Sequence, residues 1–378
     1  MRMAKQKRTR KVTVKPRSGK GKAGSQSGAR EAAVAAGPVT LDEARVLAGV
    51  SAPARPRAAG LETARAAVAQ SPSLRTIGQE REKLRREQRS ERVRRTREYQ
   101  AVMKIMKARG TLPPRAGRGE GGAEAAGERG EAFAPLQILA EGDSWFEYPV
   151  PLFGGGIVPR LERRLGVPIL NLAKTGDEVR FMLGVEERTT LTERLTNGSP
   201  AGGDWDLLLF SGGGNDIVDN PMALWVKDWN PTQPPAAHVN QPRFAAALAL
   251  VRAGYEDLIA IRDKCSPDTH LIFHGYDFAI PDGRGICKFG PWLKPTFGLR
   301  NFPTIASGQA VVSEMLGQFE AMLESLSGPR VTVVRTQGVL APQVSSWHNE
   351  LHPAKAGFEQ FADLFHQKIK QLFPARVA

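Results

Sequence analysis

Three short polar segments of the sequence carry residues that could act together in catalysis. Gly142-Asp143-Ser144-Trp145 offers a serine hydroxyl as a nucleophile, provided that the serine lies on a turn between a strand and a helix. The glycine-rich run 211–216, Ser-Gly-Gly-Gly-Asn-Asp, could direct the amide of Asn215 at a developing oxyanion. His352, within Trp-His-Asn-Glu-Leu-His-Pro at 347–353, could act as a general base.

Each of these segments also has an ordinary structural interpretation. A serine after a strand is more often a helix cap than a nucleophile, and glycine, asparagine and aspartate are common turn residues. The glycine run could cradle a phosphate, but it lacks the Gly-x-x-x-x-Gly-Lys-Ser/Thr pattern, and the next lysine is Lys227. The catalytic interpretation therefore depends on the three segments meeting in space.

Short apolar runs precede the polar segments and predict the strands that would position them. The five runs are Leu136–Ala140, Val167–Leu172, Asp206–Phe210, His270–His274 and Val331–Val334. Between them, apolar residues recur at helical spacing, most clearly over 312–326. Strands that alternate with helices indicate an α/β fold, which we expect to be a flavodoxin-like three-layer sandwich with a mainly parallel five-stranded sheet.

The carboxyl edge of such a sheet would gather the polar loops. Loops 141–148, 173–179 and 211–220 each follow one of the first three strands, and a loop before the last helix would deliver His352 to the same edge. The Pro-containing stretches 219–242 and 280–305 would either wall this site or simply cover the edge of the sheet.

Charge is concentrated in the first third of the chain. Residues 1–135 hold 31 of the 53 Lys and Arg and 13 of the 39 Asp and Glu, a net charge of +18, whereas the remainder carries −4. This distribution excludes a uniformly basic nucleic-acid-binding fold. It indicates a basic tail on a mildly acidic folded domain.

The composition also predicts how the chain is organised. We expect a basic disordered tail over 1–75, a charged helix over 76–109, a Gly/Ala-rich linker over 110–132 and a folded domain over 133–378. Within the tail, residues 41–47 could form a short helix capped by Thr40. We expect the charged helix to be solvated, although Tyr99, Val102, Met103 and Met106 could dock its last turns.

The remaining composition narrows the class of protein. No stretch reaches the roughly 18 apolar residues of a transmembrane helix, and no apolar segment follows the basic start, so we expect no secretory signal. Cys265 and Cys287 are too few for a disulfide framework, and no cluster of His and carboxylates has metal-ligand spacing. We therefore expect a cytoplasmic protein that uses neither a metal nor another cofactor.

Four blocks, in order along the chain, resemble the motifs of the SGNH/GDSL hydrolase superfamily. They are Gly142-Asp143-Ser144, Gly176 after the second strand, Gly213-x-Asn215-Asp216, and His352-Pro353. The resemblance covers about residues 136–375 and leaves the N-terminal region outside. It implies that Ser144 is the nucleophile and His352 the general base. It also implies an oxyanion hole made by the N–H groups of Ser144 and Gly176 and by the side chain of Asn215.

One position departs from the pattern of this superfamily, which usually has an aspartate three residues before the histidine. Here that residue is Asn349, followed by Glu350. Asn349 could orient a neutral His352 through its amide oxygen, Glu350 could reach the ring from a shifted loop, or the site could be a dyad or weakened. We favour Asn349, although in a serine protease the change from aspartate to asparagine lowers kcat about 10⁴-fold.

The resemblance implies a serine ester hydrolase that acts on a small-molecule, lipid or glycan ester. The alternative is a catalytically weak SGNH-like binding domain, which the basic tail tethers to nucleic acid or an anionic surface. Asn349 favours this alternative. The presence of the serine, glycine, asparagine and histidine positions together favours the hydrolase.

Overall fold

A computed structural model of the chain describes residues 37–50, 74–112, 133–148, 155–286 and 289–377. All of these ranges belong to one compact unit that begins at Gly37. Of the tail expected over 1–75, residues 1–36 and 51–73 lie outside the described residues, and so do residues 113–132 of the linker expected over 110–132. No helix within the described ranges has the length and apolar character needed to cross a membrane.

Five parallel strands form one sheet in the order β2-β1-β3-β4-β5. The strands are β1 (Ile138–Gly142), β2 (Ile169–Asn171), β3 (Leu207–Ser211), β4 (His270–His274) and β5 (Val331–Val334). In the register of the sheet, Ile138 lies opposite both Ile169 and Leu207. This strand order is that of flavodoxin-like folds, so the predicted fold class is confirmed.

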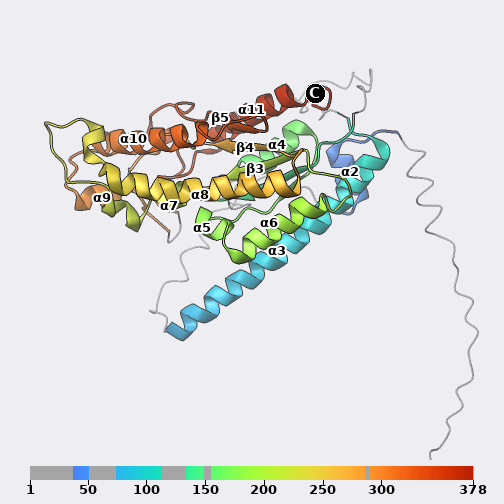
Figure 1. The fold of residues 1–378 in the computed structure, drawn as a ribbon, viewed down its shortest axis with the longest axis horizontal. Coiled ribbons are helices and arrows are strands. Elements are labelled where there is room, and N and C mark those ends of the chain that lie inside the picture. The colour runs from blue at the N-terminus through green and yellow to red at the C-terminus, as the bar shows by residue number, and fades with distance from the viewer. Residues whose placement is uncertain (1–36, 51–73, 113–132, 149–154, 287–288, 378) are drawn as a thin grey trace, which may run out of the picture. The chain divides into compact units, whose positions relative to one another are not determined.

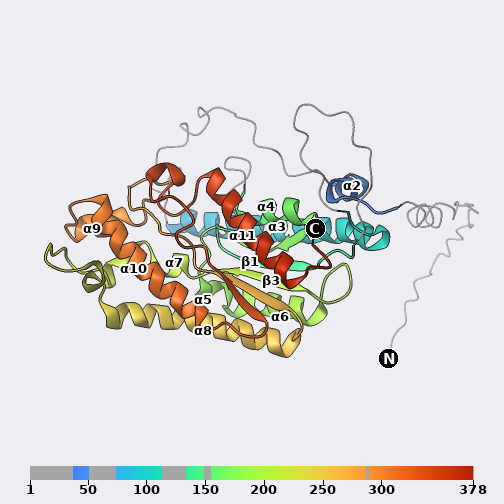
Figure 2. The same ribbon diagram turned by 90° about the horizontal axis from the view of Figure 1, so that it is seen from above.

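Helices cover both faces of this sheet. The α-helices are α2 (Leu41–Leu47), α3 (Leu74–Arg109), α4 (Ile157–Leu165), α5 (Val179–Met182), α6 (Val185–Asn197), α7 (Gly214–Ile217), α8 (Gln241–Cys265), α9 (Lys294–Leu299), α10 (Ile305–Glu324) and α11 (Lys355–Leu372). The 3₁₀ helices are η1 (Asn220–Leu224), η2 (Pro235–His238) and η3 (Val344–Ser346). α4 packs against α11, whereas α8 contacts α5, α6 and α10. Figure 1 shows α11 above the strands and α6 below them, and Figure 2 shows α8 and α11 from above.

The strand sequences explain why the sheet lies between two helical layers. Every residue of β1 and β3 is buried, and their sequences, Ile-Leu-Ala-Glu-Gly and Leu-Leu-Leu-Phe-Ser, are apolar except at the carboxyl end. Strands with continuous apolar runs need cover on both faces. Polar residues therefore gather only where the strands end, which is the edge that carries the candidate site.

Residues 37–50 of the N-terminal region pack on the folded unit, which we did not expect. The helix predicted over 41–47 is confirmed as α2, and Thr40 and Glu43 form a reciprocal capping box at its start. Leu41 is buried, and Arg45 donates to Glu162 of α4 at 3.0 Å. The disorder predicted over 1–75 therefore does not extend to residues 37–50, because their side chains find a partner surface on the folded unit.

The charged helix α3 packs on the folded unit, in contrast to the solvated helix that we expected. Tyr99, Val102, Met103 and Met106 in its last turns are buried, and the ring centroids of Tyr99 and Trp205 lie 5.8 Å apart. The folded unit consequently begins upstream of residue 133, where we had expected its start. The physical reason is that these few apolar residues suffice to dock the end of an otherwise charged helix.

Candidate active site

Ser144 stands in a turn directly after β1, at the carboxyl edge of the sheet. Its Oγ lies 2.6 Å from Nε2 of His352, which belongs to the loop before α11. Both side chains are buried. The fold therefore brings into contact the serine and the histidine that the sequence motifs singled out, although they are 208 positions apart.

Gly142 and Asp143 shape the turn that carries Ser144. A Cβ on Gly142 would stand 2.6 Å from the carbonyl oxygen of Ser211, so only glycine permits this close approach of β1 to β3. Oδ1 of Asp143 accepts hydrogen bonds from the Trp145 N–H at 2.9 Å and from the Ser211 hydroxyl at 2.8 Å. The nucleophile turn is thereby tied to the end of β3.

A buried polar network supports Asp143 from β3 and the end of β4. Tyr276 donates its phenol proton to Oδ2 of Asp143 at 2.6 Å. Nδ1 of His274 accepts the Tyr276 N–H at 3.3 Å, so its Nε2 carries the proton and donates to the Ser211 hydroxyl at 2.8 Å. Burial raises the pKa of Asp143 to about 6 and lowers the pKa of His274 to about 3. His274 is thus a neutral residue that supports the turn.

Asn349 contacts the second nitrogen of the His352 ring. Its Oδ1 lies 2.9 Å from Nδ1 of His352 and also accepts the N–H groups of Leu351 and His352, both at 3.0 Å. Because backbone N–H groups only donate, these bonds fix the amide with its oxygen toward the ring. Nδ1 must then carry the imidazole proton, which leaves an unprotonated Nε2 facing Ser144.

The amide nitrogen of Asn349 has a partner that the sequence did not indicate. Nδ2 donates to the phenol oxygen of Tyr148 at 3.1 Å, and the same oxygen lies 2.8 Å from Nδ1 of His348. The Tyr148 ring also stacks on the His352 ring, with centroids 4.3 Å apart. Tyr148 therefore fixes the orientation of both Asn349 and His352. The only sequence signal for it is its place four residues after Ser144 in the same loop.

Glu350 is next to Asn349 in the sequence but makes different contacts. Its two carboxylate oxygens accept four backbone N–H groups at 2.5–2.9 Å, those of Gly283, Trp292, Leu293 and Lys294. The residue is fully buried. A carboxylate with four donors is fully occupied. Glu350 therefore anchors residue 283 and residues 292–294 to the segment 344–353, which carries His352 and is called the histidine loop below. In this structure the residue that contacts Nδ1 of His352 is therefore Asn349 and not Glu350.

The environment of His352 keeps its imidazole neutral. Burial lowers the pKa of His352 to about 3, and the nearby His348 lowers it further in the same direction. The group on Nδ1 is an amide and supplies no negative charge to offset this effect. A neutral imidazole with a bare Nε2 is the form in which a histidine acts as a general base.

Asn215 lies at the start of α7 and lines the cavity in front of Ser144. Gly213 before it has φ +100, and a Cβ there would meet Phe319 and Val251, so this turn requires glycine. One N–H of the Asn215 amide donates to the carbonyl oxygen of Asp177 at 2.8 Å, which holds the side chain in place. Its second N–H has no partner among the described residues and is available to a ligand.

Gly176, the other expected oxyanion donor, lies in the loop between β2 and α5. It has φ +77 and open space where a Cβ would be, and it borders a hollow beside α3. Gly176 is not among the described residues that line the Ser144 cavity. The structure therefore brings Ser144, His352, Asn349 and Asn215 together, and it places Gly176 in the loop that holds the Asn215 amide.

A narrow cavity of about 50 Å³ lies beside Ser144 and His352. Many of its wall residues are apolar, namely Ile217, Val218, Met222, Ala279, Leu293, Val312, Met315, Leu316 and Leu351, and Asp143, Asn215, Tyr276 and Asp277 also line it. No lysine or arginine is among the described residues that line it. Within the same ranges, no three or more His, Cys, Asp or Glu are grouped so that they could hold a metal ion. The cavity therefore suits a small, uncharged, apolar group.

The nucleophile turn and the histidine loop are fastened directly to each other. Nε1 of Trp145 donates to the carbonyl oxygen of Leu351 at 3.0 Å. Trp292, from the stretch 280–305, has its ring centroid 6.0 Å from that of His352, and Leu293 beside it lines the cavity. Leu293 of this stretch therefore forms part of the cavity wall, and so does Met222 of the stretch 219–242.

No protein-family model and no curated protein matches the chain. Solved structures of similar fold include a lipase from a goat rumen metagenome, with 18% identity, a TM-score of 0.40 and coverage of 61% of this chain and 96% of the other. An extracellular lipase from Streptomyces rimosus has 15% identity, a TM-score of 0.41 and coverage of 61% and 99%. A protein from Slackia heliotrinireducens, described as a candidate SGNH hydrolase, has 12% identity, a TM-score of 0.35 and coverage of 62% and 99%.

The last of these structures carries the name of the superfamily that the four sequence blocks resemble. The resemblance of the chain to SGNH/GDSL hydrolases rests on these sequence motifs and not on the solved structures. At such identities and TM-scores, the similarity assigns neither an activity nor site residues to this chain.

Proposed function

We propose that the chain is a serine ester hydrolase in which Ser144 is the nucleophile, His352 the general base and Asn349 the group that orients the base. The observation that carries this proposal is the distance of 2.6 Å between Ser144 Oγ and His352 Nε2, with the Asn349 oxygen 2.9 Å from the opposite ring nitrogen. A nucleophile, a base and an orienting group in hydrogen-bond reach of one another are the arrangement that activates a serine.

The reaction is an acyl transfer in two halves. As Ser144 Oγ forms its bond to the ester carbonyl carbon, its proton passes to Nε2 of His352. The carbonyl oxygen becomes an oxyanion, which we expect the N–H groups of Ser144 and Gly176 and the unpaired N–H of Asn215 to bind. The imidazolium then gives its proton to the leaving alcohol. A water molecule then attacks the acyl carbon and gives a proton to the same nitrogen. The bond from the acyl carbon to Ser144 Oγ breaks as that proton returns to Oγ, which releases the acid and restores the free enzyme.

Asn349 provides part of what an aspartate would provide at this position. Its amide oxygen holds the ring in the tautomer with the proton on Nδ1, but it offers a dipole instead of a full charge to the imidazolium. In the serine protease with asparagine at the orienting position, the loss of rate reflects the wrong tautomer. Here the N–H groups of Leu351 and His352 fix the amide and prevent that loss. The proposed enzyme is therefore able to catalyse the reaction, but protonating His352 costs more free energy than it would beside an aspartate.

The cavity beside Ser144 favours an ester with a small apolar acyl group. Its aliphatic walls, such as Val312 and Met315 of α10, offer no hydrogen-bond partners for hydroxyl groups. A sugar ring inside it would lose most of its hydrogen bonds to water, because polar groups that line the cavity, such as Asp143 and Tyr276, are already paired with each other, and this loss is costly. The acyl group therefore occupies the cavity, and the alcohol part of a small-molecule, lipid or glycan ester lies outside it.

Covalent labelling tests the proposal directly. A fluorophosphonate probe reacts with activated serines, so the full-length chain is expected to become labelled and to hydrolyse p-nitrophenyl acetate. Ser144→Ala is expected to abolish both. Ser345→Ala, which changes an exposed serine on the histidine loop, serves as the matched control and keeps both activities. His352→Ala is expected to lower the labelling rate at least a hundredfold, because general-base assistance contributes about 10²–10⁴-fold.

Absence of labelling and of hydrolysis in the wild-type chain would overturn this proposal. The catalytically weak binding domain would then remain, and the neutral Asn349 beside His352 is the feature that favours it. Labelling that persists in Ser144→Ala would likewise exclude Ser144 as the nucleophile. The basic tail and its polyanionic partner remain predictions from the sequence.

A further inference from the structure

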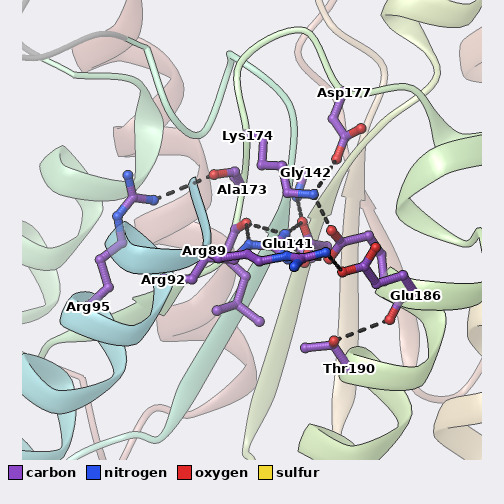
Figure 3. A network of polar contacts seen from close by, with 12 residues as sticks. Arg89, Arg92, Arg95, Glu141, Gly142, Ala173, Lys174, Asp177, Glu186 and Thr190 are labelled. Carbon is purple, nitrogen blue, oxygen red and sulfur yellow. Dashed lines mark hydrogen bonds and ion pairs between the residues drawn. The ribbon is translucent and has the colours of Figure 1, made fainter. Parts of the chain in front are cut away.

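Arg92 of α3 reaches the carboxyl end of the sheet from outside. Its Nε and Nη2 donate to the carbonyl oxygen of Leu172, directly after β2, at 3.0 and 2.8 Å. Figure 3 shows the Arg92 side chain lying between α3 and the loop that begins there. The loop leads to Gly176 and Asp177, so a residue of the N-terminal helix holds the start of the segment that contains an expected oxyanion donor.

The same guanidinium group also reaches Glu141, the residue before Gly142 at the end of β1. Nη2 of Arg92 lies 3.3 and 3.4 Å from the two carboxylate oxygens of Glu141. Glu141 is buried, and its Oε1 accepts the Gly142 N–H at 3.1 Å. Arg92 is thus connected through one side chain to the strand end that carries Ser144.

Further contacts join these two points to the Asn215 amide. The Lys174 N–H donates to the Gly142 carbonyl oxygen at 2.8 Å, so the loop after β2 is paired with β1. Both Arg92 and Lys174 form ion pairs with Glu187 of α6, and Lys174 Nζ lies 3.7 Å from Asp177. The backbone carbonyl oxygen of Asp177 accepts a hydrogen bond from the side-chain amide of Asn215. A continuous series of contacts therefore runs from α3 to the rim of the Ser144 cavity.

The charges in this cluster explain why Arg92 matters to it. Glu141, Glu187 and Asp177 carry three carboxylates, and Arg92 and Lys174 supply the two nearby cations. Burial raises the pKa of Glu141 to about 7, while Arg92 opposes this effect. Removing Arg92 would leave three acidic groups around one lysine, and the Leu172 carbonyl oxygen would lose both of its guanidinium donors.

We propose that Arg92 is a positioning residue of the candidate active site, which holds the end of β1 and the loop 172–177 in fixed register with Asn215. Helix α3 is then an integral part of the hydrolase unit and not a tether. The proposal rests on the proposed function, because its effect on rate presumes that Ser144 and Asn215 act on an ester.

The test compares variants of the full-length chain. Arg92→Met removes all donors at similar length, whereas Arg92→Lys keeps the charge but cannot bond Leu172 and both carboxylates at once. Arg97→Met is the control on the same helix, since Arg97 is exposed. Arg45→Met is the control for lost stability, since it breaks the buried pair with Glu162 away from the site. The measurements are kcat and KM for p-nitrophenyl acetate, the rate of fluorophosphonate labelling, and Tm.

Arg92→Met is expected to lower kcat and the labelling rate about 10- to 100-fold, because a misplaced oxyanion donor costs up to the 10²–10³-fold of a lost one. KM should change less than about threefold, and Arg92→Lys should be intermediate, with kcat at least about threefold below the wild type. Arg97→Met should leave all values unchanged within about twofold. Arg45→Met should lower Tm but leave kcat within about twofold.

Two results would overturn the proposal while leaving the hydrolase intact. One is a kcat for Arg92→Met within twofold of Arg97→Met, or, where Arg92→Met does not fold, a wild-type kcat in Arg92→Lys. The other is an equal loss of kcat in Arg45→Met, which would show that any loss of stability lowers the rate. If the wild type neither labels nor hydrolyses esters, amide hydrogen exchange decides. Faster exchange over 141–146 and 172–177 in Arg92→Met than in Arg97→Met is expected, and equal exchange refutes the positioning role.

Discussion

Replacing Asn349 with aspartate tests how the candidate site works at its least usual position. In Asn349→Asp, one carboxylate oxygen takes the place of Oδ1 and accepts the same three donors, the N–H groups of Leu351 and His352 and the ring Nδ1–H. The other oxygen replaces Nδ2 and faces the Tyr148 hydroxyl, which turns to donate. Four donors favour the ionised carboxylate even in a buried place. We therefore expect the variant to fold and to gain a charge beside His352.

The size of the effect follows from the geometry. A full negative charge about 4 Å from the charge of the imidazolium contributes roughly 4 kcal/mol at an effective dielectric constant of about 20. An opposite charge at this range also raises a histidine pKa by about 1–3 units, or about 1.4–4 kcal/mol. The two estimates agree. The pKa of His352, now about 3, would rise to between about 4 and 6, and kcat at pH 8 would increase about 10- to 1000-fold.

Steady-state hydrolysis of p-nitrophenyl acetate between pH 4 and 9 measures both quantities. In the wild type, His352 stays neutral, so this residue causes no fall in kcat/KM near pH 6.5. In Asn349→Asp, the acidic limb that belongs to His352 should move to higher pH while the plateau of kcat rises. Asn349→Ala is the matched control, since it removes the acceptor for Nδ1–H, and kcat should fall at least a hundredfold.

One outcome would refute this reasoning. If folded Asn349→Asp had a kcat no higher than that of the wild type, with an unchanged acidic limb, a charge at position 349 would not reach the ring of His352. The orientation of the amide deduced from the two backbone N–H groups would then have no catalytic consequence.

Three further outcomes are expected from other parts of the site. In Glu350→Gln, a single acceptor oxygen faces four backbone N–H groups. The free energy of unfolding, measured in urea, should therefore fall by about 2–4 kcal/mol. An unchanged free energy would show that the contacts of Glu350 do not stabilise the fold. Asp143 has a folded pKa of about 6 against an unfolded value of 3.8, so the fold favours its protonated form, and this contribution is lost as pH rises through that interval. Asp143→Asn lacks this titration, so its stability relative to the wild type should improve by about 2.4 kcal/mol between pH 4 and pH 7. A difference independent of pH would contradict the raised pKa of Asp143. In Val312→Phe, the added ring fills part of the cavity beside Ser144. The factor by which kcat/KM falls should therefore be at least ten times larger for a butyrate ester than for an acetate ester. Equal factors for the two esters would show that the acyl group binds elsewhere.

The sheet and its loops could be predicted because the strands are short apolar runs that end in polar or glycine residues. β4 and β5 have the expected bounds, and β1 and β3 are shifted by one or two residues toward their carboxyl ends. Loops after parallel strands meet at one edge, so the fold class also predicted which segments meet. The register of neither β1 nor β3 follows from periodicity, because every position of a doubly covered strand is apolar.

The contacts around His352 were predictable only in outline. The position three residues before His352 indicated Asn349 as a partner of the imidazole ring, with Glu350 next to it as the alternative. The sequence left open which of the two contacts the ring. The answer depends on the loop 283–294, whose backbone N–H groups occupy Glu350, and on Tyr148, whose hydroxyl holds the amide. Both come from segments far away in the sequence, and neither carries a motif.

The docking of α3 escaped prediction for a different reason. Helix packing is usually recognised by an apolar stripe. Among the side chains of α3 that the structure describes, the buried apolar ones lie in the last turns and include Met103 and Met106. Upstream of these, the helix is held by guanidinium groups, which look the same in sequence as the arginines of a solvated helix. Only the positions of their acceptors on β1, β2 and α6 distinguish the two cases.

The placement of α3 along β2 has a consequence for the behaviour of the chain among its own copies. β2 is an outermost strand, and Arg92 and Arg95 cover the carbonyl oxygens of its last residue, Asn171, and of Leu172 and Ala173, which follow it. An outer strand with bare carbonyl oxygens is a template for pairing with a strand of another molecule. A shortened chain that starts at residue 133 would leave the edge of β2 uncovered. We therefore expect such a fragment to aggregate, whatever its catalytic rate.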